Sequence, residues 1–172
     1  MIKSIVKVLY IFLMFTALQV LLLNKIHLFG IASLFLYIYV IIKAPVNLSR
    51  SLMVVIAFLL GFVIDMFSNT LGMHTAACTL AGFFRDPLLK VFAERDMPED
   101  ITPSSRQLGS GVYFKYVVSV VIIHHAALFL IESLSLYDPL FLTIRIVASV
   151  IFTSLIILIL EQFSIVMRHG TA

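Results

Sequence analysis

Long apolar runs, separated by short polar breaks, leave this chain very few possible folds. A helix that crosses a bilayer needs about 20 mainly apolar residues, and several runs among the 172 residues approach or exceed this length. Charged residues make up only 12% of the chain, which is roughly half of their usual share in a soluble domain. We therefore predict an all-α membrane protein that forms a single domain over residues 1–172, without a separate soluble domain.

Six apolar segments are the candidate transmembrane helices. They cover residues 5–23, 28–42, 52–67, 73–84, 113–134 and 139–166. The fourth is the weakest, because a helix rises about 1.5 Å per residue and residues 73–84 would cover little more than half of the hydrocarbon layer. This segment either crosses the membrane, packed among other helices or extended by Leu88 to Val91, or turns back as a re-entrant hairpin.

The basic residues decide between a crossing and a hairpin, because Lys and Arg concentrate in the cytoplasmic loops of membrane proteins. With six crossings, both termini and the main loop, residues 85–112, share one side with ten of the twelve basic residues. These ten are Lys3, Lys7, Lys43, Arg50, Arg85, Lys90, Arg95, Arg106, Lys115 and Arg168. A hairpin would move five of them to the other side. We therefore predict six transmembrane helices with both termini in the cytoplasm.

Charge and motifs narrow the function classes. The net charge of +3 reports this topology, so we expect no nucleic-acid partner. Cys78 is the only cysteine, which excludes an internal disulfide and a cysteine metal site. The chain has no nucleophile motif, no phosphate-binding glycine loop and no HExxH motif. We therefore expect neither enzymatic activity nor a cofactor.

The stretch from Gly61 to Gly72 places a carboxylate, Asp65, in or just under the hydrocarbon layer. A charge at the centre of a bilayer costs about 2.5–3.5 kcal/mol, so it needs a partner. Glu132 lies near the same, outer end of its segment, and Arg145 lies in the outer half of the last segment. We predict that Arg145 pairs with Asp65 or Glu132, in a structural role first and a ligand-binding role as the alternative.

Small residues recur in the fourth segment. Ala77 and Ala81, and likewise Cys78 and Gly82, are four positions apart, and this spacing lets helices approach closely in lipid. They either pack inside the bundle or form a groove for a helix of another chain. The candidate partner or ligand pocket consists of Gly61, Asp65, Gly72, His74, Ala77, Ala81, Gly82, Glu132 and Arg145.

Two further groups of polar residues have their own predicted roles. His124 and His125 point about 100° apart on a helix, so they cannot bind one metal ion by themselves, and we expect a polar core stripe and no metal site. The basic residues of the main loop are predicted on the cytoplasmic surface, where they either only report topology or contact membrane lipid. These residues are Arg85, Lys90, Arg95 and Arg106.

The order of these motifs resembles the MreD family of bacterial rod-shape-determining membrane proteins. The first motif is Gly61-x-x-x-Asp65, followed by Ser68, by Gly72-Met73-His74 and by Gly82-Phe83-Phe84-Arg85. The second is His124-His125-x-x-x-Phe129-x-x-Glu132, which resembles one branch of the family and is followed by Arg145, Ser149, Thr153 and Glu161. The resemblance covers most of the chain.

The resemblance implies a non-enzymatic component of the cell-elongation machinery in the bacterial inner membrane. Such a protein would bind MreC, act indirectly with MreB, RodA and the partner transpeptidase of RodA, and help control cell shape and side-wall peptidoglycan synthesis. The family fold is similar to that of the substrate-binding subunits of energy-coupling-factor vitamin transporters, which carry a pocket open to the outer face. The alternative is therefore a small-molecule-binding subunit of such a transporter, although the bulky first segment lacks the small-residue face that coupling would need.

Overall fold

The structure, a computed structural model, describes residues 2–23, 27–28, 31–70, 72–93, 101–133 and 138–169. Helices account for most of these residues. The elements, in chain order, are α1 (Ile2–Leu21), β1 (His27–Leu28), β2 (Ala32–Ser33), the 3-10 helix η2 (Leu36–Ile38), α2 (Tyr39–Lys43), α3 (Arg50–Ser68), α4 (Met73–Phe92), α5 (Ser105–Leu108), α6 (Ser110–Glu132) and α7 (Pro139–His169).

Three of the helices are long and apolar enough to cross a membrane. They are α3, α6 and the Pro139–Ser164 part of α7, with mean hydropathies of 2.3, 1.9 and 2.4. The predicted class, a helical protein with membrane-spanning character, is confirmed at this level. A shorter apolar helix, Val8–Leu21, lies within α1.

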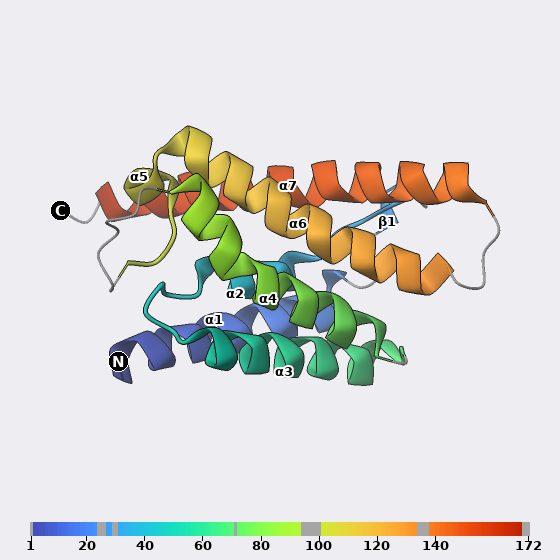
Figure 1. The fold of residues 1–172 in the computed structure, drawn as a ribbon, viewed down its shortest axis with the longest axis horizontal. Coiled ribbons are helices and arrows are strands. Elements are labelled where there is room, and N and C mark those ends of the chain that lie inside the picture. Colours follow the sequence, from blue (N-terminus) through green and yellow to red (C-terminus); the bar gives the residue numbers. More distant parts are fainter. Residues whose placement is uncertain are drawn as a thin grey trace.

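The long helices form a bundle in which α4 joins two pairs. Figure 1 shows α1 and α3 running side by side on one side of the molecule and α6 with α7 on the other. Helix α4 crosses obliquely between them and packs against both α3 and α6. One end of the bundle, here called the terminal end, holds the start of α1, the end of α7 and α5. The opposite end, the turn end, holds the α3–α4 turn, the end of α6 and the start of α7.

The turn between α3 and α4 forms where the sequence predicts a polar break. Asn69 takes a left-handed conformation, with φ of 53°, and its N–H donates to the carbonyl of Asp65 at the end of α3. Gly72, with φ of 78°, precedes α4. Positive φ costs glycine little and is tolerated by asparagine, so these two residues reverse the chain between the helices.

The predicted helix over residues 28–42 is wrong. The two short strands pair antiparallel, with His27 opposite Ser33, and among the described residues of this segment only η2 and α2 are helical. Its backbone is held by side chains of other elements: the amide N–H of Leu36 donates to Gln19 Oε1 (2.9 Å), and the Leu34 carbonyl accepts from Gln19 Nε2 (3.0 Å). Irregular backbone persists at membrane depth only where protein or water satisfies it. The remote glutamine therefore permits a conformation that apolar periodicity cannot reveal.

Helix α4 is longer than the predicted fourth segment. It continues beyond Phe84, through Pro87, to Phe92. Proline removes one hydrogen bond of the helix, but such breaks are tolerated where neighbouring helices pack around them. Residues 85–92 and 110–112, which we assigned to the main loop, are therefore helical, and the connection between α4 and α6 is shorter than expected.

Candidate functional site

A cavity of about 410 Å³ opens at the turn end of the bundle. Its lining comes from α1, the segment around β2, the α3–α4 turn, α6 and α7. The polar groups in the lining include His74, Glu132 and Arg145, which belong to the predicted pocket. Phe35, Phe67 and Phe129 contribute aromatic walls. The fold thus brings three of the predicted pocket residues to one cavity.

The predicted ion pair of Arg145 forms with Glu132. Arg145 Nη2 lies 3.2 Å from Glu132 Oε1, and Nη1 donates to the same oxygen at 3.2 Å. The guanidinium also lies over the ring of Phe129, 4.6 Å from the ring centroid. Because Phe129 and Glu132 are three residues apart on α6, they share one face of the helix. This face therefore fixes both the charge and the plane of the guanidinium at the cavity.

Asp65, the other possible partner of Arg145, instead holds the start of α4. Its Oδ1 accepts from the Thr70 hydroxyl (2.5 Å) and the His74 amide (3.0 Å). Its Oδ2 accepts from the Thr75 amide (2.8 Å) and the Thr75 hydroxyl (2.5 Å). The first amides of a helix have no partner within the helix and favour a negative charge. Asp65 therefore acts as a remote cap of α4, and it does not line the cavity.

A hydrogen-bond chain runs from the cavity into the core. The Tyr37 hydroxyl lies 2.7 Å from His74 Nδ1 and 2.9 Å from His124 Nε2. His125 Nδ1 donates to the Val121 carbonyl at 2.9 Å, so its Nε2, 3.1 Å from Thr153 Oγ1, accepts from that hydroxyl. Both His124 and His125 are fully buried, in agreement with a polar core stripe. Over the described residues, no three His, Cys, Asp or Glu side chains are grouped to hold a metal ion.

Phe35 lines the cavity and packs against three neighbouring rings. Its ring packs against His74, His125 and Phe129, with centroid separations of 5.5, 5.3 and 6.2 Å. Its amide N–H donates to Thr153 Oγ1 at 3.4 Å. Sequence reasoning missed Phe35 because residues 28–42 were predicted as a regular helix. An aromatic residue two positions after the isolated Ser33 in an apolar run was the available signal.

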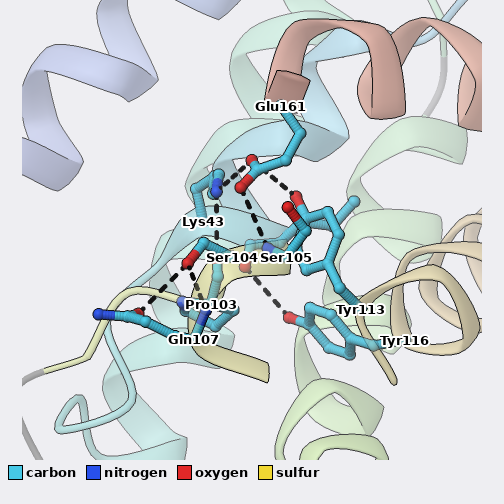
Figure 2. Close-up of polar contacts among 9 residues, drawn as sticks. Lys43, Pro103, Ser104, Ser105, Gln107, Tyr113, Tyr116 and Glu161 are labelled. Carbon is cyan, nitrogen blue, oxygen red and sulfur yellow. Dashed lines mark hydrogen bonds and ion pairs between the residues drawn. The ribbon is translucent and has the colours of Figure 1, made fainter. Parts of the chain in front are cut away.

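A second polar cluster, at the terminal end, was not predicted. Figure 2 shows Lys43 and Glu161 facing one another as an ion pair, while Lys43 Nζ donates to the Pro103 carbonyl at 2.8 Å. Glu161 also accepts from the Ser105 amide and the Tyr113 hydroxyl, each at 3.2 Å. Buried charges persist only when paired and hydrogen-bonded. This cluster ties α2, α5, α6 and α7 together; the lone Glu161 in an apolar run was the signal for it.

The prediction that Arg85 lies on the cytoplasmic surface is wrong, because its side chain is fully buried. Its Nε donates to the Ile41 carbonyl at 2.9 Å, its Nη2 to the Ala44 carbonyl, and its Nη1 to Asp86 Oδ1 at 2.8 Å. The last carbonyls of a helix need outside donors, so Arg85 caps the end of α2. Lys90 and Arg106 are exposed, as predicted, whereas Arg95 lies outside the described residues.

The small residues of α4 face the inside of this chain, which corrects their assignment to a partner or ligand pocket. Ala77 and Ala81 are fully buried and Gly82 is buried. A Cβ on Gly82 would lie 2.6 Å from Ala57 Cβ, and one on Gly61 would lie 2.4 Å from the His74 carbonyl. These glycines let α3 and α4 approach closely, so this stripe offers no groove to a second protein. Gly72, by contrast, lies exposed in the turn.

The surface of α3 and α4 that faces outward carries a separate apolar groove of about 580 Å³. We call it the α3–α4 groove. Its lining includes Phe58, Phe62, Thr75, Ala76, Thr79, Leu80 and Phe83.

Comparison with protein-family models, curated proteins and solved structures finds no match to this chain. The resemblance to the MreD family therefore depends on the sequence motifs described above, and the function is a proposal.

Proposed function

We propose that the chain is a non-enzymatic, multi-pass component of the bacterial inner membrane that binds MreC in the cell-elongation machinery. Through MreC it would act with MreB, RodA and the partner transpeptidase of RodA in side-wall peptidoglycan synthesis and cell shape. The motif order around Gly61 and Asp65 and around His124 and Glu132 supports the family. In the structure these motifs carry out structural tasks: the first joins α3 to α4, and the second joins α6 to α7.

Six crossings with both termini in the cytoplasm remain part of this proposal. Helices α3, α6 and α7 have the length of a span, and α1 and α4 have 20 residues each. The broken segment that contains η2 and α2 would be the sixth crossing, enclosed by the other five. Both the start of α1 and the end of α7 lie at the terminal end, where exposed Lys90 and Arg106 also flank the connection between α4 and α6.

The observation that best supports binding of an MreC helix is the composition of the α3–α4 groove. Its rim is apolar and exposed: the Phe58 and Phe62 rings stack with an interplanar angle of 7°, and Phe83 is 44% exposed. Its lining also includes smaller residues, Thr75, Ala76 and Thr79, which we call its floor. Small residues let two helix backbones approach in lipid. The floor hydroxyls are already engaged, since Thr79 donates to the Thr75 carbonyl at 2.6 Å. The groove therefore fits an apolar helix that brings no polar partner.

Filling the groove tests this proposal. We expect Ala76→Leu and Thr79→Leu to abolish co-purification with MreC in mild detergent, because a bulky floor keeps the partner backbone away. The matched control is Ala17→Leu, since Ala17 is an equally small, exposed residue on α1. Retention of MreC by folded Ala76→Leu and Thr79→Leu proteins would refute docking at this groove.

The cavity at the turn end favours a second candidate, a small-molecule-binding subunit of an energy-coupling-factor-type transporter. The exposed face of α1 argues against it, because bulky Leu9, Tyr10 and Leu13 are exposed there, at 55%, 66% and 60%. The co-purification experiment separates the two candidates. Recovery of an ATPase pair with its coupling subunit, in place of MreC, would favour the transporter.

A further inference from the structure

The cavity at the turn end has the composition of a binding site. Empty packing defects in proteins are lined by apolar groups, whereas this cavity contains an acid, a base and an imidazole together with aromatic walls. Its volume of about 410 Å³ falls in the range of about 300–1,000 Å³ typical of small-molecule sites, which combine apolar walls with a few placed polar groups.

Irregular backbone lines the same cavity. Ser33, Leu34 and Phe35 contribute to its wall, and their non-helical conformation interrupts the apolar segment that would otherwise form a helix. Side chains from two helices hold this backbone: the Ser33 amide donates to Ser149 Oγ at 3.0 Å, and Gln19 binds the Leu34 carbonyl. In membrane proteins such interruptions accompany binding sites. Here the interruption gives the cavity a preorganised wall.

The charges at the cavity balance. Arg145 and Glu132 carry opposite charges and remain accessible, with side chains 17% and 37% exposed. His74 is 7% exposed, and because Tyr37 engages its Nδ1, its Nε2 is the nitrogen left for the cavity. A ligand with a single negative charge would meet repulsion from Glu132, and one with a single positive charge would meet repulsion from Arg145. A ligand that carries both charges can pair with both side chains.

We propose that this cavity binds a small zwitterion with an apolar body. The acidic group of the ligand pairs with Arg145, its ammonium group pairs with Glu132, and its apolar part packs on Phe35, Phe67 and Phe129. Two sources supply this chemistry: the head group of a zwitterionic phospholipid, or a free apolar amino acid or short peptide. The inference is independent of MreC binding, because the α3–α4 groove and the cavity have no lining residue in common.

Two matched pairs of probes test the inference by isothermal titration calorimetry on the purified chain in neutral detergent. Dihexanoyl phosphatidylethanolamine is compared with dihexanoyl phosphatidylglycerol, which has the same chains but only the negative charge. Phenylalanine is compared with 3-phenylpropanoate, which lacks the amino group and has only the negative charge. We expect at least one zwitterion to bind about tenfold more tightly than its singly charged partner, as one added charged contact predicts. The pair that shows the preference identifies the source.

Glu132→Gln provides the decisive variant. It keeps the shape of the side chain, removes the partner of the ammonium group and releases Arg145, so we expect the preference to disappear and phosphatidylglycerol to bind about tenfold more tightly than to wild type. Asp138→Asn is the control: it neutralises an exposed acid at the start of α7 that does not line the cavity, and it should leave all affinities unchanged.

Three results would overturn the inference. They are no binding of either zwitterion to wild type, equal binding within both pairs, or an undiminished preference in folded Glu132→Gln. If Glu132→Gln does not fold, the preference measured within each pair on wild type decides by itself.

Discussion

At the scale of single residues, the charged residues near the ends of the apolar helices serve different tasks, although the sequence predicts them at similar depth. Arg145 and Glu132 pair with one another beside a cavity. Both carboxylate oxygens of Asp65 instead accept hydrogen bonds from the first turn of α4. The difference lies in which groups the fold brings within hydrogen-bond distance of each side chain. The turn at Asn69 and Gly72 brings the α4 amides within hydrogen-bond distance of Asp65, whereas Arg145 lies against Glu132.

Asp65→Asn should destabilise the protein by about 1–3 kcal/mol, the cost of leaving buried polar groups unsatisfied. Both Asp65 oxygens accept hydrogen bonds, from Thr70 and His74 on one side and from Thr75 on the other. The side chain of asparagine would direct its NH2 group, which is a donor, toward one of these two groups of donors. Thermal unfolding in detergent measures the loss.

The control for this prediction is Asp138→Asn. Among the described residues, Asp138 accepts hydrogen bonds through Oδ1, from the Leu140 and Phe141 amides, so asparagine can keep both bonds. Asparagine and aspartate are about equally good at such a position. Equal stability of Asp65→Asn and wild type would show that Asp65 does not cap α4.

At the scale of elements, the broken segment between α1 and α3 is the main departure from a regular helical bundle. Apart from half-buried Phe35, residues 32–43 are buried, so the backbone groups of residues 33–36 depend on partners from elsewhere in this chain. Gln19 supplies two of these partners. Ser149 and Thr153 on α7 supply others. The break is thus a property of three elements together.

Gln19→Leu should destabilise this segment strongly. It leaves the Leu34 carbonyl and the Leu36 amide without their partner, at roughly 1–3 kcal/mol for each group. We expect a lower unfolding temperature and faster hydrogen exchange at the Leu36 amide. Gln162→Leu is the matched control, because Gln162 is exposed on α7. Unchanged exchange at Leu36 in the Gln19 variant would contradict this role.

At the scale of the whole molecule, the two ends of the bundle are built differently. At the terminal end the charges of Lys43, Glu161 and Arg85 are buried and engaged within this chain. At the turn end, Arg145 and Glu132 line the cavity. In the proposed topology the terminal end faces the cytoplasm and the turn end faces outward. A ligand or partner on the outer side would therefore meet the turn end.

Labelling of single cysteines tests this orientation. In a Cys78→Ser background, Asn69→Cys and Asp138→Cys at the turn end should react with a membrane-impermeant maleimide added to intact cells. Lys90→Cys and Arg106→Cys should react only after the cells are opened. All four residues are exposed, so access alone decides the outcome. Labelling of Lys90→Cys in intact cells would disprove the proposed orientation.

Much of the helical framework could be predicted from local sequence. Long apolar runs predicted α3, α6 and α7, because length and hydropathy alone decide whether a helix can span a bilayer. The polar break before Gly72 predicted the turn. The shortage of cations in the outer half of the segments predicted that Arg145 would pair with one of two acids. The structure selects Glu132, whose neighbour Phe129 also stacks on the guanidinium.

Other features could not be predicted, because they depend on residues far apart in the sequence. Arg85 resembles a loop cation, yet α2 folds back and offers it carbonyls about 40 positions earlier in the chain. The spacing of Ala77 and Ala81 is equally suited to a partner helix, and only the packing of α4 within this chain buries them. In the sequence, Lys43 resembles a basic residue that only marks the cytoplasmic side. In the structure, α7 places Glu161 against it as an ion-pair partner.

The sequence by itself determined that this chain forms apolar helices with few charges between them, since a bilayer leaves a polypeptide few alternatives. It also determined that Arg145 needs an acidic partner. Only the tertiary structure decided which polar side chains are paired inside the bundle and which line a cavity or groove. The reason is that a buried donor or acceptor must be satisfied by whatever packing brings near, as Gln19 satisfies the extended backbone before η2.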